Sequence, residues 1–193
     1  VRDHCMASEA KHFGLTATTP QLPAAVEIAR AIRAVRPDTR TILGGPHITL
    51  VNAAFKQERH KGRVGRAVEA LKKLEEMFDV LVAGDGEEAI FLACQSNAPK
   101  LVDADDPKSS LFLTNRRLTE LPFPARHLVD HGSYHYSIDG KRAYSLIAQL
   151  GCPFECGFCG GRESPMLRRV RTRTSESIVA EMVHMAQTMG CEG

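Results

Sequence analysis

The chain has 193 residues, enough for one domain or for one domain and part of a second. Its hydrophobic content of 43% and charged content of 25% are ordinary for a globular protein, and no stretch approaches the roughly 20 apolar residues that a membrane helix needs. The formal net charge of +2 is too near zero to argue for nucleic acid as the main partner, and none is expected.

Strands and helices alternate over the first hundred residues. Buried strands are expected at residues 12–18, 41–43 and 79–83, where short apolar runs end in small or glycine residues. Apolar residues at helical spacing predict helices at 25–35, 64–78 and 87–94. Alternation with short, glycine-rich joints is typical of a parallel sheet covered by helices, so we predict an α/β fold with a Rossmann-like parallel sheet.

The three joints that follow the predicted strands are candidate ligand-binding loops. Open α/β sheets bind ligands along the carboxyl ends of their strands, where glycine lets the backbone approach a ligand closely. The candidate cofactor-binding residues are Thr16, Thr18 and Thr19 in the first joint, Gly44, Gly45, Pro46 and His47 in the second, and Gly84, Asp85, Gly86 and Glu87 in the third. For each joint alone, a simple turn is the alternative.

A connector follows from residue 99, because a charged turn and the prolines Pro122 and Pro124 interrupt regular structure there. Residues 144–150 are expected to form a buried strand that leads into a cysteine loop. A last helix is expected after Thr174 or Ser175, either of which could cap it. The predicted organisation is therefore a sheet domain at 1–110, a linker at 111–143 and the start of a second domain at 144–193.

Three of the six cysteines, Cys152, Cys156 and Cys159, lie close together on a loop that contains proline and glycine. This clustering indicates a metal site in a reducing compartment such as the cytoplasm, rather than a disulfide framework. Four cysteines close a [4Fe–4S] cluster, whereas three leave one iron open to a ligand. Zinc is the competing metal, but a structural zinc site usually has a fourth Cys or His nearby, and the next cysteine is the distant Cys191.

The C-x3-C-x2-C spacing, with the aromatic Phe158 before the third cysteine, resembles the radical S-adenosylmethionine (SAM) superfamily. The resemblance implies that Cys152, Cys156 and Cys159 bind a [4Fe–4S] cluster, that SAM chelates the open iron, and that Phe158 lies against its adenine. It implies reductive cleavage of SAM, a small-molecule substrate and an electron donor as partners. It also implies that residues 144–193 begin a partial TIM-type barrel.

The first part of the chain resembles the cobalamin-binding domain that precedes this barrel in one subgroup, because residues 14–19, 43–47 and 83–88 match its three ligand-edge loops in order. The D-x-H-x-x-G motif that supplies a cobalt ligand is absent from the sequence, so cobalamin is expected without that ligand. Since the barrel would stop after one strand and one helix, and the chain begins with Val1, we expect a piece of a longer enzyme with no catalytic side chain of its own.

The leading functional prediction is methylation or radical rearrangement of a small molecule, driven by SAM cleavage and assisted by cobalamin. A corrinoid- or cofactor-binding module without catalysis is the alternative. A structural zinc protein is a third hypothesis, which metal content would separate from the first.

Overall fold

The computed structural model describes residues 2–192, which form two compact units. The sheet unit comprises residues 2–112 together with Pro153–Arg168, and the C-terminal unit comprises Leu113–Cys152 and residues 169–192. The predicted domain ranges begin at residue 1 and end at residue 193, both of which lie outside the described residues, and their boundaries stay a prediction. No helix between residues 2 and 192 is long and apolar enough to cross a membrane.

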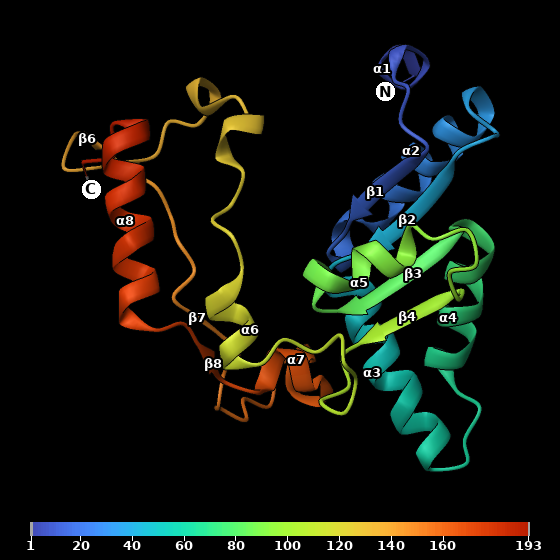
Figure 1. Cartoon of the computed structure of the whole chain (residues 1–193). Helices are drawn as coiled ribbons and strands as arrows, with labels where there is room; N and C mark the ends of the chain where they lie inside the picture. The colour runs from blue at the N-terminus through green and yellow to red at the C-terminus, as the bar shows by residue number, and fades with distance from the viewer. Residues whose placement is uncertain (1, 193) are drawn as a thin grey trace. The chain divides into compact units, whose positions relative to one another are not determined.

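The sheet unit is built on four parallel strands in the order β1-β2-β3-β4 (Figure 1). They are β1 (His12–Thr16), β2 (Arg40–Gly44), β3 (Val80–Gly84) and β4 (Leu101–Ala104). The register pairs Thr16 with Gly44 and Gly84 with Ala104, so the strands end at one common edge. The predicted α/β fold with a parallel, Rossmann-like sheet is confirmed.

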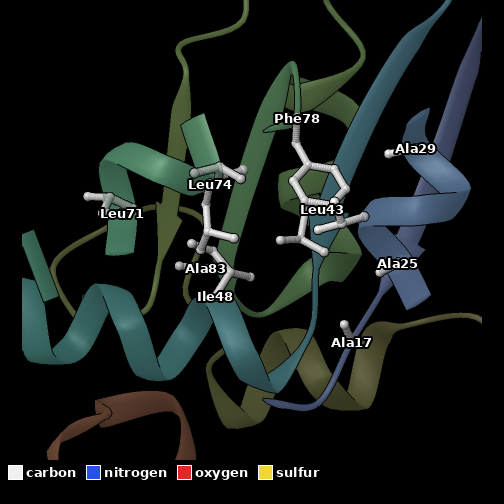
Figure 2. Packing of buried hydrophobic residues seen from close by; sticks show 11 residues of the cluster. Ala17, Ala25, Ala29, Leu43, Ile48, Leu71, Leu74, Phe78 and Ala83 are labelled. Carbon is white, nitrogen blue, oxygen red and sulfur yellow. The ribbon is translucent and has the colours of Figure 1, made fainter. Parts of the chain in front are cut away.

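Helices cover both faces of the sheet. Successive residues of a strand point to opposite faces, so the central strands bury side chains on both sides. On one face Leu43 and Leu81 belong to a cluster with Phe78 and with side chains of three helices (Figure 2). These are α2 (Leu22–Val35), α3 (Pro46–His60) and α4 (Arg66–Met77). On the other face Ile42 packs in a second cluster with residues of α5 (Gly86–Ala93).

The remaining helices of the sheet unit are short. The helix α1 (Arg2–Ala7) precedes β1, and a 3-10 helix (Thr19–Gln21) leads into α2. After the first 112 residues the chain returns to this unit with a 3-10 helix (Gly160–Glu163) and the one-turn helix α7 (Pro165–Arg168).

The helix α3 and the strand β4 are among the elements of this unit that the sequence pattern does not predict. The pattern predicts no helix between residues 43 and 64, whereas α3 occupies Pro46–His60. Its buried positions include the polar Thr49 and Asn52, and its last residues are polar, so the apolar pattern of this helix is weak. The strand β4 lies in the predicted connector and contains Asp103. A charged residue in so short a strand interrupts the apolar pattern by which a strand is predicted. In the structure, Asn52 and Lys56 pair with this carboxylate.

The C-terminal unit has little sheet. Its helices are α6 (Asn115–Glu120) and α8 (Ser175–Met189), with short 3-10 helices at Arg126–Leu128 and His131–Ser133. Its strands form antiparallel pairs. The strand β5 (Ser137–Ile138) pairs with β6 (Lys141–Arg142), and β7 (Gln149–Leu150) pairs with β8 (Arg171–Thr172). Thr174 caps α8 as predicted, because its hydroxyl accepts from Ser177 N at 3.3 Å.

The strand predicted at residues 144–150 is reduced to the two residues of β7, and most of that segment is not buried. Because β7 pairs with β8 in an antiparallel manner, the unit does not display the parallel strand expected at the start of a barrel.

Candidate functional site

The loops that follow β1 and β2 pack directly on each other at the carboxyl edge of the sheet. His47 N donates to Ala17 O at 2.9 Å, and Ala17 N donates to Gly44 O at 3.3 Å. Gly45 has a φ of 93°, and a Cβ there would collide with Thr16 Oγ1 and lie 3.0 Å from Ala17 N. The glycine is therefore required both by its backbone conformation and by the close approach of the first loop.

The side chains of the first two predicted loops are partly engaged with each other. Thr18 Oγ1 donates to Gln21 Oε1 at 2.8 Å, and Thr18 N donates to the same atom at 3.0 Å, as in a helix-capping box. Thr19 Oγ1 lies 3.1 Å from His47 Nδ1. Burial lowers the pKa of His47, so its imidazole is neutral at pH 7 and can donate through one nitrogen and accept through the other.

Thr49, which the sequence analysis does not single out, connects the second loop to the third. Its Oγ1 donates to Gly45 O at 3.0 Å and accepts from Gly84 N at 3.0 Å, and the residue is fully buried. Gly84 has a φ of 93°, and a Cβ there would collide with the backbone of Ala104 and Asp105. The ends of β2, β3 and β4 are thus held by short contacts that involve Thr49 and two glycines.

The third predicted loop opens α5 with acidic residues. Asp85 is the N-cap and is buried, while Glu87 and Glu88 lie in the first turn. Carboxylates at a helix N-terminus are stabilised by the helix dipole. They also repel anions, so the first turn of α5 favours a polar or cationic group over a phosphate.

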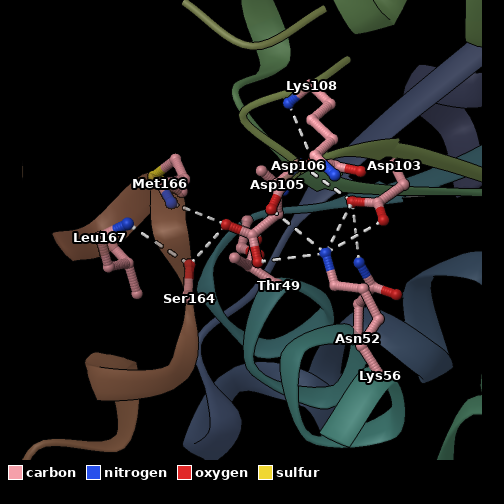
Figure 3. A network of polar contacts seen from close by, with 12 residues as sticks. Thr49, Asn52, Lys56, Asp103, Asp105, Asp106, Lys108, Ser164, Met166 and Leu167 are labelled. Atoms are coloured by element: carbon pink, nitrogen blue, oxygen red, sulfur yellow. Dashed lines mark hydrogen bonds and ion pairs between the residues drawn. The ribbon is translucent and has the colours of Figure 1, made fainter. Parts of the chain in front are cut away.

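A charged cluster lies at the carboxyl end of β4, between this strand and α3 (Figure 3). Lys56 Nζ lies 3.0 Å from Asp103 Oδ2 and donates to Asp105 O at 3.1 Å. Asn52 Nδ2 donates to Asp103 Oδ1 at 3.0 Å. The sequence gives only a weak indication of this cluster, because Asp103 and Asp105 lie in a segment whose composition is typical of a charged turn.

Asp105 is the buried member of this cluster, with no side-chain exposure. Its Oδ1 accepts from Ser164 Oγ at 2.7 Å and from Met166 N at 2.8 Å, whereas Oδ2 has no hydrogen-bond partner and lies 3.8 Å from Lys56 Nζ. Burial raises the pKa of Asp105, and the two hydrogen bonds and the charge of Lys56 only partly oppose this effect.

The three predicted metal ligands all have exposed side chains and free thiols. Cys156 and Cys159 belong to the sheet unit and are joined by a turn in which Cys159 N donates to Cys156 O at 3.0 Å, while Cys152 ends the first segment of the C-terminal unit. Within each unit, as far as the structure describes it, no three His, Cys, Asp or Glu side chains form a metal site. Unpaired thiols match the soft ligands that iron–sulfur clusters and zinc require, so the donor set fits such a group in chemistry. Phe158 is 94% exposed.

Comparison with known proteins identifies a methyltransferase as a relative. The chain is 24% identical over 169 residues to an uncharacterized methyltransferase of Pyrococcus horikoshii, and the alignment covers 88% of this chain and 35% of that protein. The chain thus spans about a third of the length of this relative. No solved structure matches the chain.

No family model matches the chain either, and this finding corrects the expected family. The assignment to the radical SAM superfamily, and to its cobalamin-binding subgroup, was wrong, because no model of that family matches and the relative is named only as a methyltransferase. Three cysteines and one aromatic residue form a short pattern that thiolate sites of several kinds can share, so the pattern does not by itself identify a family. The similarity to the methyltransferase is the relationship that the comparisons support.

Proposed function

We propose that this chain is part of an enzyme that transfers a methyl group from SAM to a small molecule. The observation that carries the proposal is the similarity to the methyltransferase of Pyrococcus horikoshii, which extends over 88% of the chain. The relative's name indicates methyl transfer, and SAM is the methyl donor that we infer for it. Because the chain spans about a third of that relative, the complete active site would include residues beyond those present here.

The carboxyl edge of the sheet is the proposed cofactor-binding surface, since open α/β sheets bind ligands there. Gly45, Gly84 and Thr49 are used in packing the loops, which leaves exposed groups such as Thr19 and Glu87, with the half-buried His47, to contact a ligand. The other candidate contacts are Thr16, Thr18, Gly44, Pro46, Asp85 and Gly86. The acidic first turn of α5 suits the positive sulfonium of SAM, and cobalamin is the second ligand that we propose for this edge.

The second proposed site is a [4Fe–4S] cluster on Cys152, Cys156 and Cys159, a proposal carried by the spacing of the three thiols in the chain. Three thiolates would leave one iron open for the amino and carboxylate groups of SAM, and Phe158 would lie against the adenine. A reduced cluster would supply one electron to the bound SAM.

Anaerobic reconstitution with iron and sulfide tests this second site. We would compare the chain with a variant in which Cys152, Cys156 and Cys159 are alanine, and a Cys94→Ala variant serves as the matched control for loss of a thiol elsewhere. About four irons per chain, retained in the control and lost in the triple variant, would support the cluster. Bound zinc, or iron that is unaffected by the triple substitution, would contradict it.

Binding of SAM tests the methyltransferase proposal separately from the metal. Equilibrium dialysis with methyl-labelled SAM, with and without reconstitution, would measure binding to the cluster and to the sheet edge. Saturable binding is expected, and binding to neither form of the chain would count against a role for this segment in holding the methyl donor.

A module that binds a corrinoid without catalysis is the second candidate function, and the parallel sheet with its open loop edge favours it. Binding of cobalamin that is insensitive to the triple cysteine substitution, together with failure to bind iron and SAM, would support this alternative over the first.

A further inference from the structure

The segment Pro153–Arg168, which carries Cys156 and Cys159, belongs to the sheet unit although about forty residues separate it in sequence from the end of that unit's first segment. Its buried anchor is Ser164, which has no exposed surface. Ser164 Oγ donates to Asp105 Oδ1 at 2.7 Å and Met166 N donates to the same oxygen at 2.8 Å (Figure 3). One carboxylate oxygen thus holds a hydroxyl and a backbone amide of the cysteine-bearing segment.

The turn between the cysteines and Ser164 is also fixed by packing. Leu167 N donates to Ser164 O at 3.1 Å, which closes the first turn of α7, and it lies 3.3 Å from Ser164 Oγ, which also accepts from it. Gly161 is buried, and a Cβ there would lie 2.7 Å from Leu167 Cδ1. Glu163 accepts from the side-chain amide of Gln57 on α3. The chain that follows Cys159 is therefore tied to α3 and to the end of β4.

Asp105 is itself held in one orientation by groups of the sheet unit. Its backbone N–H donates to Asp103 Oδ1 at 2.9 Å, and its carbonyl accepts from Lys56 Nζ at 3.1 Å. A fully buried carboxylate is costly unless it is hydrogen-bonded, and both hydrogen bonds to the Asp105 carboxylate come from the cysteine-bearing segment. The buried carboxylate is therefore stabilised by its hydrogen bonds from Ser164 and Met166, together with the charge of Lys56.

We propose that Asp105 is a positioning residue that fastens the cysteine-bearing segment to the carboxyl edge of the sheet, and so fixes where Cys156 and Cys159 present their thiols. The contact places two of the proposed cluster ligands on the same unit as the proposed cofactor-binding edge. The role of the thiols as ligands rests on the proposed function, whereas the attachment of the segment does not.

Two measurements on the full chain test separately the attachment of the segment and the positioning of its thiols. Hydrogen exchange at Met166, whose amide donates to Asp105, reports the attachment without any metal. The rate at which a reconstituted cluster loses iron to a chelator reports the positioning of the thiols. The variants are Ser164→Ala, which leaves Asp105, Asp103 and Lys56 intact, and Ser164→Thr, which restores a hydroxyl. Ser8→Ala is the matched control, because the Ser8 hydroxyl lies in the same unit and accepts a local hydrogen bond, from Ala10 N at 3.2 Å.

We expect Ser164→Ala to accelerate exchange at Met166 about tenfold, because loss of the Ser164 hydrogen bond loosens the contact with Asp105, and to accelerate iron loss severalfold. Ser164→Thr should recover part of both effects, and Ser8→Ala should change neither. Unchanged exchange in Ser164→Ala would overturn the attachment, and faster exchange with unchanged iron loss would overturn the positioning role. If the unaltered chain takes up no iron, the proposed cluster fails, and the exchange data alone still decide whether Asp105 fastens the segment.

Discussion

Replacement of Thr49 by valine tests whether side-chain hydrogen bonds hold the carboxyl edge of the sheet together. The Thr49 hydroxyl bridges Gly45 O and Gly84 N at 3.0 Å each, in a fully buried position. Valine preserves the branched shape but removes the donor and the acceptor. Gly45 O would still accept from the backbone N–H of residue 49 at 3.3 Å, so the main loss is the acceptor for Gly84 N.

The size of the effect follows from these contacts. A buried N–H that loses its acceptor costs about 1–3 kcal/mol, and the loss of the second, replaceable hydrogen bond adds about 0.5–1 kcal/mol. We therefore expect Thr49→Val to lower the free energy of unfolding of the sheet unit by about 2–3 kcal/mol. Thr49→Ser keeps the hydroxyl and removes one methyl group, which should cost only about 1 kcal/mol.

Urea unfolding of the full chain, followed by circular dichroism, measures both values from the shift of the transition midpoint. Thr49→Val must be clearly less stable than Thr49→Ser if the hydroxyl is the important group. A valine variant within about 0.5 kcal/mol of the original chain, or a serine variant that is as unstable as the valine variant, would refute this reasoning.

Three further substitutions test other contacts. Gly45→Ala should lower the melting temperature by several degrees, because alanine is strained at a φ of 93° and its Cβ would collide with the first loop, and a thermal unfolding scan checks this. Glu181→Gln should cost about 3 kcal/mol, because the buried carboxylate accepts from Arg126 at 2.5 Å and also from Arg173. Burial raises the pKa of Glu181, but the hydrogen bonds from Arg173 and Arg126 lower it overall. The stabilisation that the Glu181 carboxylate contributes should therefore be present above the unfolded pKa of about 4.3 and fade below it. Urea unfolding as a function of pH should show this loss of stability in the original chain and not in Glu181→Gln. Burial lowers the pKa of His47, so the unfolded chain binds more protons and stability should fall as the pH drops below about 6.5; His47→Gln should flatten that part of the same profile.

The sheet was predictable where burial produces a local pattern. The strands β2 and β3 are buried on both faces and end in glycine, so a continuous apolar run identifies each of them. The strand β4 has an aspartate in its four residues, and Asn52 and Lys56 on α3 supply a hydrogen bond and a positive charge that make this aspartate compatible with a sheet. A local pattern cannot predict such a strand, because the stabilising group lies more than forty residues away along the chain.

The candidate site was predictable to a similar extent. The three loops could be located because each follows a strand, but Thr49 and Asp105 could not, because their roles depend on contacts between distant segments. The Ser164–Asp105 hydrogen bond joins residues 59 positions apart. The Cys-x3-Cys-x2-Cys spacing revealed a metal-site candidate and yet led to the wrong family, since three thiols specify a type of ligand and not a protein fold.

At the carboxyl edge of the sheet some residues pack the loops and others are free to contact a ligand, and this difference determines which substitutions can inform on function. Gly45, Gly84 and Thr49 hold the loops to one another, so changing them alters stability before any effect on a ligand can be seen. The Glu87 side chain is exposed in the first turn of α5, and its replacement removes charge without breaking a core contact. A change in ligand affinity at Glu87 with unchanged unfolding would therefore locate the ligand at this edge, whereas the same change at Thr49 would not.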